Sequence, residues 1–195
     1  MRFPLDLRFK IVAIAPQISV TDAAGTLLLY VKQQAFKLKE SVTVFRDLEQ
    51  THPIYRIAAD RVLDISAQYR IDDEGGSPLG VLRRQGMRSL WRAHYEVHRG
   101  GVPFLTIREE NPWVKLVDGL LGEIPFLGLF TGYMLHPAYR VERIDTRSTV
   151  MRAVKQPALL EGRFTIEQVT ELTQPEQTLA VLAVLMMLLL ERRRG

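Results

Sequence analysis

The most distinctive part of the chain is Thr178-Leu-Ala-Val-Leu-Ala-Val-Leu-Met-Met-Leu-Leu-Leu190, because no side chain between Leu179 and Leu190 is polar. Helix signals flank this stretch. Thr173-Gln-Pro-Glu176 has the form of a capping box with proline in the first turn, and Glu191-Arg-Arg-Arg194 places cations at the negative end of the helix dipole. We therefore predict a helix over about 174–192 that is apolar on every side and needs apolar surroundings.

The length of the stretch favours a protein core over a membrane. At 1.5 Å per residue its apolar part spans roughly 18 Å, whereas a bilayer core is about 30 Å thick and requires about 20 apolar residues. Burying its Leu, Val and Met side chains gains roughly 1.5–3 kcal/mol each before entropy is subtracted. We interpret the stretch as a buried core helix and keep a C-terminal tail anchor with a basic flank as the alternative.

Composition sets few limits on function. The chain has 195 residues, 47 % of them hydrophobic and 25 % charged, which is ordinary for a globular protein with a sizeable core. It contains no cysteine, so a disulfide scaffold and thiolate chemistry are excluded. The charged start, Met1-Arg-Phe-Pro-Leu-Asp-Leu-Arg8, does not resemble an export signal. The net charge of +4 is mild and spread along the chain, so a nucleic-acid role is not favoured.

The chain before the helix predicts strands and tight turns. Glycine-containing turns join several of them, among them Ala23-Ala-Gly25, Asp73-Glu-Gly-Gly76 and Arg99-Gly-Gly101. A short helix is expected near 112–121, where leucines follow at helical spacing. The predicted strands, within about 7–168, are 7–13, 17–22, 26–33, 41–46, 53–58, 67–72, 78–83, 89–98, 103–108, 138–143, 148–155 and 161–167.

Alternation along 90–98 indicates an antiparallel sheet with one buried face. Trp91, Ala93, Tyr95 and Val97 share one face, and Arg92, His94, Glu96 and His98 share the other, which we expect to be solvated. Tyr69-Arg-Ile and Tyr95-Glu-Val are each followed by a Gly-Gly turn and a second strand, which suggests repeated hairpins.

About twelve strands and one apolar helix predict the architecture. The diameter of a closed barrel grows with strand number, and an α-helix is about 10–12 Å across. The helix can therefore plug a closed antiparallel barrel of about twelve strands, and closure removes exposed edges. We expect a mainly β protein, with residues 1–195 as a single domain.

Several motifs resemble the LURP-one-related family. Tyr30-Val-Lys-Gln-Gln-Ala-Phe-Lys-Leu-Lys-Glu40, followed by Val42-Thr-Val-Phe45, looks like its opening motif. Tyr69-Arg-Ile-Asp-Asp73 with Gly80, and Ser89-Leu90 with Tyr95-Glu-Val97, resemble its middle strands, and the apolar tail resembles its last element. The match covers roughly Gln17 to Leu190. Glu110-Asn-Pro-Trp113, Pro125 and Tyr139-Arg-Val141 are similar to bacterial members of the family and not to the plant ones.

The resemblance implies the Tubby C-terminal-like fold shared with phospholipid scramblases, a twelve-stranded barrel around a hydrophobic C-terminal helix. It implies no established activity, although relatives bind phosphoinositides or are linked to lipid movement. The calcium-loop pattern expected of scramblases is missing, because Asp72-Asp-Glu-Gly-Gly76 lacks alternate oxygen ligands and a closing glutamate.

No catalytic, cofactor or metal site is predicted. His94, Glu96 and His98 share a strand face but are interpreted as a solvated surface, and Asp72, Asp73 and Glu74 as turn residues rather than a calcium site. Ser148 and Thr149 have no evident His–Asp partners, so a nucleophile has no support. We expect no cofactor and no enzymatic activity.

Two groups of residues are candidate contact sites. A patch for anionic lipid headgroups is predicted from Lys37, Lys39, Arg83, Arg84, Arg88 and Arg92, with Arg99 nearby; the alternative is scattered surface charge. Phe126, Phe130 and Tyr133, in the apolar segment Ile124–Leu135, are a candidate membrane-touching or partner-touching loop, or else a lid over one barrel mouth.

These patterns predict a cytoplasmic barrel that binds rather than catalyses. The leading hypothesis is peripheral recognition of anionic phospholipid surfaces. The alternatives are a tail-anchored or scramblase-like membrane protein and a scaffold for a protein partner.

Overall fold

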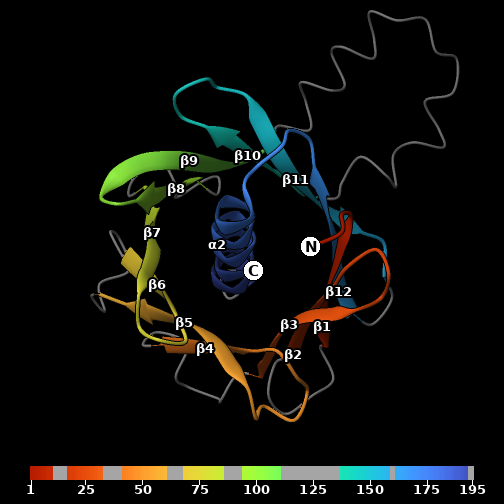
Figure 1. Ribbon diagram of the computed structural model, residues 1–195. Coiled ribbons are helices and arrows are strands. Elements are labelled where there is room, and N and C mark those ends of the chain that lie inside the picture. The colour runs from red at the N-terminus through yellow and green to blue at the C-terminus, as the bar shows by residue number, and fades with distance from the viewer. Residues whose placement is uncertain are drawn as a thin grey trace, which may run out of the picture.

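A ring of strands surrounds helix α2, which lies in the middle of the ring (Figure 1). The computed structural model of the protein describes residues 1–10, 17–32, 41–60, 68–85, 94–110, 137–158 and 161–192. The short helix expected near 112–121 lies outside these residues, and so does the beginning of the predicted strand 89–98.

Twelve strands and the helix α2 make up the barrel in the described residues. They are β1 (Leu5–Lys10), β2 (Gln17–Thr21), β3 (Leu27–Lys32), β4 (Ser41–Phe45), β5 (Pro53–Ala59), β6 (Gln68–Asp73), β7 (Pro78–Arg84), β8 (His94–Arg99), β9 (Val102–Glu109), β10 (Ala138–Arg143), β11 (Thr149–Gln156), β12 (Glu161–Gln168) and α2 (Gln174–Arg192).

The strands form a closed antiparallel meander. Each strand pairs with its neighbours in the chain, and β1 pairs with β12 from Leu5↔Ile166 to Lys10↔Glu161, which closes the ring. The predicted barrel around a C-terminal helix is therefore confirmed. The first strand was predicted at 7–13 but begins at Leu5, because Leu5, Leu7 and Phe9 alternate into the core.

The two mouths of the barrel are built differently. Because the strands alternate in direction, the even-numbered strands end where α2 begins, and we call this end the N-mouth. The odd-numbered strands end at the C-mouth, where α2 ends. Hairpin turns such as 22–26 and 74–77 lie at the N-mouth. The connections 33–40, 86–93 and 111–136 follow odd-numbered strands, so the flanking strand ends place their attachment points at the C-mouth.

Helix α2 is the centre of the hydrophobic core. Every residue from Leu179 to Leu189 is at most 3 % exposed, and the helix packs within one apolar cluster with inward-facing side chains of the barrel wall. The helix is long and apolar enough to span a membrane, but most of it is buried inside the barrel. The interpretation of the stretch as a core helix is confirmed.

The N-terminal end of α2 is fixed by the predicted capping box. The backbone N–H of Thr173 donates to Glu176 Oε2 over 3.0 Å, as a capping box requires. Arg143 and Arg99 donate to the same carboxylate over 3.2 and 3.4 Å. Burial by itself would raise the pKa of Glu176, but hydrogen bonds from Thr173 and the charge of Arg143 lower this pKa overall. The wall thus supplies two cations to a buried carboxylate on the helix.

The other end of α2 is held by aromatic residues near the C-mouth. The Tyr95 hydroxyl donates to Glu191 Oε1 over 2.5 Å, and burial followed by this hydrogen bond raises the pKa of Tyr95. The Arg192 guanidinium lies 5.3 Å from the ring centroid of Phe9, which meets Phe164 edge-on at 6.1 Å. Both helix ends are therefore attached to opposite mouths of the same wall.

The strand β8 departs from its predicted faces at one residue. Tyr95 and Val97 point into the core as expected, but His98 is only 5 % exposed and not solvated. The reason is a bulge between Val97 and His98, where the partner on β9 changes from Leu105 to Pro103. The expectation that the whole second face of this strand is solvated is wrong at this position.

Glycine at position 80 permits close contact between wall and helix. A Cβ atom there would lie 2.6 Å from the His98 carbonyl oxygen and 2.8 Å from Leu179 Cδ1. Neither the paired backbone of β8 nor the packed leucine is free to move away, so only glycine fits.

Gly80→Ala should therefore lower the free energy of unfolding by about 1–3 kcal/mol. Gly75→Ala is the control, since its Cβ would meet only Asp73 Oδ1 at an ordinary 3.5 Å; its effect should stay within about 0.5 kcal/mol. Denaturant unfolding measures both, and equal losses would contradict the close approach at Gly80.

Glu176→Gln should lower the free energy of unfolding by about 1–3 kcal/mol at neutral pH, because two arginines lose their anionic partner. The pKa of Glu176 is lowered by folding, so its contribution is complete above the ordinary glutamate value of about 4.3 and is lost as the pH falls through the folded-state pKa. The difference from wild type should consequently shrink in acid. Denaturant midpoints at neutral and acidic pH test this, with exposed Glu171→Gln as the control; a difference that is independent of pH would argue against the carboxylate charge as its source.

Candidate functional site

The structure separates the two described arginines of the predicted basic patch. Arg83 and Arg84 are successive residues of β7, so their side chains point to opposite faces of the wall. Arg83 lies on the outer face between Gln68 and Glu96, and its Nε is buried without a hydrogen-bond partner in the part of the chain that the structure describes. Arg84 lies opposite Tyr95 on the inner side, where its charge acts to lower the pKa of that tyrosine.

The other predicted contact residues lie outside the described residues. They are Lys37, Lys39, Arg88 and Arg92 among the cations, and Phe126, Phe130 and Tyr133 in the apolar segment. What the structure does define is where their connections attach. The strands on either side of 33–40, 86–93 and 111–136 all meet these segments at the C-mouth.

Cationic side chains mark the C-mouth itself. Five of the odd-numbered strands carry a lysine or arginine in their last two residues, but on β9 this is Arg108, which the carboxylate of Glu109 follows. The cations of the other four strands and the arginine at the end of α2 form what we call the basic rim: Lys10, Lys32, Arg84, Lys155 and Arg192. Four of them are exposed, and Arg84 is half-buried. The strands β5 and β9 instead end beside Asp60 and Glu109, so the cations concentrate on the side formed by β11, β12, β1, β2 and β3.

The N-mouth turns are rich in carboxylates that bind the turn backbone. Asp22, Asp73 and Asp145 each accept a backbone N–H within their own turn, over 3.0, 2.8 and 2.7 Å. Asp47 accepts the N–H groups of Thr51 and His52, and these bonds, led by that of Thr51, lower its pKa to about 2. Asp73 ends β6 and binds the turn that follows, as expected of a turn residue, but Asp72 lies within the strand and is only 4 % exposed, so the interpretation as a turn residue is wrong for Asp72.

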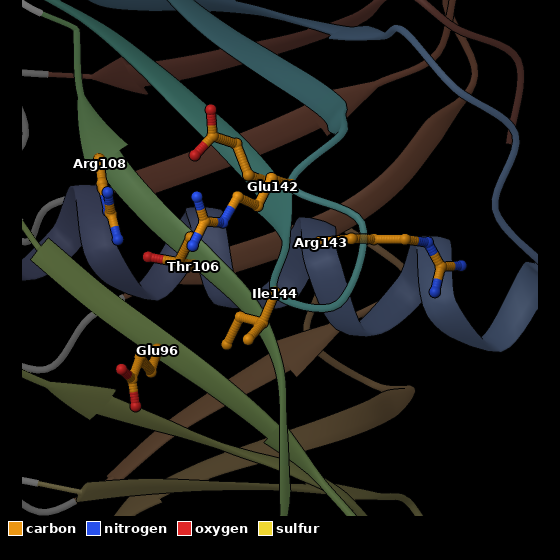
Figure 2. Close-up of a pocket in the computed structure, with 7 residues that line it drawn as sticks. Glu96, Thr106, Arg108, Glu142, Arg143 and Ile144 are labelled. Carbon is orange, nitrogen blue, oxygen red and sulfur yellow. The ribbon is translucent and has the colours of Figure 1, made fainter.

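A groove lies on the outer wall formed by β8, β9 and β10 (Figure 2). It has a volume of about 550 Å³ and is lined by Glu96, Thr106, Arg108, Glu142, Arg143, Ile144 and Arg147. Glu96, Thr106 and Glu142 are cross-strand neighbours in one row, and the buried Thr106 hydroxyl donates to the Tyr95 carbonyl oxygen over 3.3 Å.

The charges of this groove are nearly balanced. Figure 2 shows Arg143 turned away from the other labelled side chains, in agreement with its 3.2 Å contact to Glu176. The remaining charged residues of the lining are two arginines, Arg108 and Arg147, and two glutamates, Glu96 and Glu142. Such a groove suits a polar partner of mixed charge and offers no preference for anions.

Arg147 holds a strained backbone at the edge of the groove. Its φ of 56° lies in the left-handed region that favours glycine. It closes the turn between β10 and β11, where the Arg143 N–H donates to the Ser148 carbonyl oxygen over 2.9 Å.

Metal ligation has little geometric basis among the residues described. His98 Nε2 lies 3.3 Å from Glu96 Oε2, and no group of three or more His, Cys, Asp or Glu residues suited to a metal ion occurs in this part of the chain. Asp72 also belongs to no such group among the described residues, and its Oδ2 accepts a hydrogen bond from Arg70 Nε over 2.8 Å.

Sequence reasoning named Arg84 and Arg99 only in connection with one predicted patch, and the structure places Arg99 at the other mouth, beside Glu176. It missed the three lysines of the basic rim and Arg143. Lys10, Lys32 and Lys155 stand far apart in the chain and form no cluster there. The signal that could have found these lysines is their position, since each lies at or next to the end of an odd-numbered strand. Arg99 and Arg143 also end successive even-numbered strands, so both reach the same mouth as the start of α2.

The geometry defines a closed β-barrel whose lumen is filled by its own helix, so ligands are confined to the outer wall and the mouths. The LURP-one-related family model matches residues 27–156, about two-thirds of the chain, and the chain belongs to this family. An X-ray structure of a protein from Arabidopsis thaliana is similar over 98 % of this chain and 92 % of that one, with 14 % identity and a TM-score of 0.50. At this identity the likeness shows the fold alone. No curated protein matches the chain.

Arg147→Gly should raise the free energy of unfolding by about 1 kcal/mol, because glycine adopts a positive φ without steric cost. Gln50→Gly, at a φ of 63° in the turn between β4 and β5, is a matched variant away from the groove and should give a similar gain. Thermal or denaturant unfolding measures both. A loss of stability for Arg147→Gly alone would mean that contacts of its side chain outweigh the backbone strain.

Proposed function

We propose that this protein binds anionic phospholipid surfaces peripherally, with the C-mouth of the barrel facing the membrane. The observation that carries the proposal is the basic rim, because Lys10, Lys32, Lys155 and Arg192 are exposed at one mouth. The turn carboxylates lie at the opposite mouth. This charge separation orients the molecule in the field of an anionic surface, where each Lys or Arg near the lipid contributes about 1 kcal/mol.

The sequence-predicted contact residues fit the same orientation. Lys37 and Lys39, Arg88 and Arg92, and Phe126, Phe130 and Tyr133 belong to connections whose flanking strands end at the C-mouth. Cations combined with apolar and aromatic side chains are the composition with which peripheral proteins hold a membrane interface. In this proposal the protein is cytoplasmic, binds rather than catalyses, and needs no cofactor.

A tail-anchored or scramblase-like role is the second candidate, favoured by the length and hydropathy of α2. Lipid would satisfy the apolar helix as well as the barrel does. The wall, however, would then keep an apolar inner face around an empty lumen, including Leu7, Ile71 and Ile107, which are 0 % exposed around the helix. The side chains of the wall would lose their packing partners, and for this reason we favour the peripheral mode.

A scaffold for a protein partner is the third candidate, and the mixed-charge groove beside Arg108 and Glu142 is its support. The finer resemblance, to bacterial members of the family and to the Tubby-like and scramblase proteins, agrees with a lipid-related role and remains a prediction.

The double variant Lys32→Glu/Lys155→Glu should reduce binding to vesicles containing phosphatidylserine by about a hundredfold or more, since each cation near the surface contributes about 1 kcal/mol. Flotation with liposomes measures this, at low and high salt and with neutral phosphatidylcholine vesicles beside the anionic ones. Wild-type binding should weaken as salt is added, because the charges are exposed.

The matched control reverses charge at the other mouth, with Arg2→Glu/Arg46→Glu; both arginines precede or follow strands at the N-mouth. Its binding should remain close to that of wild type. Equal binding to neutral vesicles, or equal loss in both double variants, would exclude the proposed orientation. No binding under any condition would favour the partner scaffold.

A further inference from the structure

A small pocket on the outer wall, next to the basic rim, differs from the groove in its chemistry. It is lined by Lys10, Gln17, Ser19, Tyr30 and Leu48, and has a volume of about 220 Å³. A water molecule occupies about 30 Å³ in the liquid, so the pocket holds a group of several non-hydrogen atoms. Its floor is formed by β1, β2 and β3, and Leu48 reaches it from the turn between β4 and β5.

The strand register brings the polar side chains together. Gln17 is the cross-strand partner of both Lys10 and Lys32, and Ser19 is the partner of Tyr30. All of these residues alternate with core residues such as Ile18 and Val31, so their side chains share the outer face. The stems of Lys10 and Lys32 therefore stand about 10 Å apart, one strand to each side of Gln17.

Tyr30 is the informative member of this group. It is only 6 % exposed, yet it does not belong to the apolar cluster that surrounds α2. Among the described residues its hydroxyl has no hydrogen-bond partner, and the same is true of the side chains of Lys10, Gln17 and Ser19. The hydroxyl is not among the buried polar atoms that lack a partner, so it reaches the surface of the pocket, where it can donate to a bound acceptor.

The donors in the pocket select for an anion. Lysine, tyrosine and serine donate hydrogen bonds, the glutamine amide adds two more N–H groups, and no carboxylate lines the pocket. Burial raises the pKa of Tyr30, which keeps its phenol protonated as a donor. Glu161 is the other cross-strand partner of Lys10, but it belongs to β12, on the side of β1 away from the pocket. The groove on β8–β10, with two glutamates, lacks this bias.

We propose that Lys10, Gln17, Ser19 and Tyr30 form a binding site for a phosphate monoester group. The several oxygens of such a group can accept from lysine, hydroxyl and amide donors at once, and its charge exceeds that of a phosphodiester. The site extends along the outer wall from Lys10 of the basic rim, so a lipid headgroup such as phosphatidic acid is one source of the phosphate, and a soluble phosphate ester is the other. Only the lipid source rests on the proposed function.

Calorimetric titration of the full-length protein with glycerol 3-phosphate tests the site without a membrane. Wild type should bind saturably, and Tyr30→Phe and Ser19→Ala should each weaken binding several-fold, with Lys10→Gln weakening it about tenfold or more. Tyr55→Phe, on β5 and outside the pocket, is the matched control and should bind as wild type does. Absence of saturable binding, or binding that all three pocket variants leave unchanged, would overturn the proposal.

Flotation separates the two sources of phosphate and the two proposals. With a lipid ligand, wild type should prefer phosphatidic acid vesicles to phosphatidylserine vesicles of equal anionic lipid content. The Tyr30→Phe variant should bind both kinds of vesicle without that preference. Lys155→Glu should weaken binding to both vesicles but leave glycerol 3-phosphate binding intact. Glycerol 3-phosphate binding without any vesicle binding would support the site with a soluble ester and reject the membrane function. Vesicle binding without glycerol 3-phosphate binding would support the membrane function and reject the phosphate site.

Discussion

A helix without a polar face is unstable in water, and most of this structure serves to bury it. From Leu179 to Leu189 the side chains of α2 are almost completely buried, and every surrounding strand contributes to their enclosure. A single flat sheet would cover one side of such a helix. Only a ring covers all sides, and a ring of antiparallel strands also leaves no unpaired edge between its first and last members. The closure of the ring between β1 and β12 and the burial of α2 therefore meet the same requirement.

The polar contacts at the helix ends add position to this non-directional attraction. Hydrophobic burial alone would tolerate sliding or rotation of a uniformly apolar cylinder. The Glu176 carboxylate, held by Thr173, Arg99 and Arg143, and the hydrogen bond between Tyr95 and Glu191 set the height of the helix in the barrel. The close approach at Gly80 sets one face of it against β7. These few contacts give an apolar plug a defined register.

Much of the fold could be predicted from the sequence, because each element carried a local signal. The capping box at Thr173 and the glycine turns placed element ends within a few residues of those observed. The buried position of His98 was missed, since a bulge shifts the register without a mark in the residue pattern. The candidate site was predicted less well. Arg83 and Arg84 look like one cluster in the chain but face opposite sides of a strand, whereas Lys10, Gln17 and Tyr30 meet only through strand pairing. Contacts between strands depend on register, which a linear pattern does not reveal.

The order of the chain around the barrel has a consequence for how the protein reaches its folded state. The wall cannot close until β12 meets β1, which pairs residues near the beginning of the chain with residues that follow almost all other strands. The core helix comes later still. Until it docks, the inner faces of all earlier strands lack their main partner, and a sheet with an exposed apolar face and open edges is prone to self-association. Non-local closure is also slow, because loop entropy is lost before its contacts form. The apolar interior of the barrel is therefore exposed until the last element of the chain is in place.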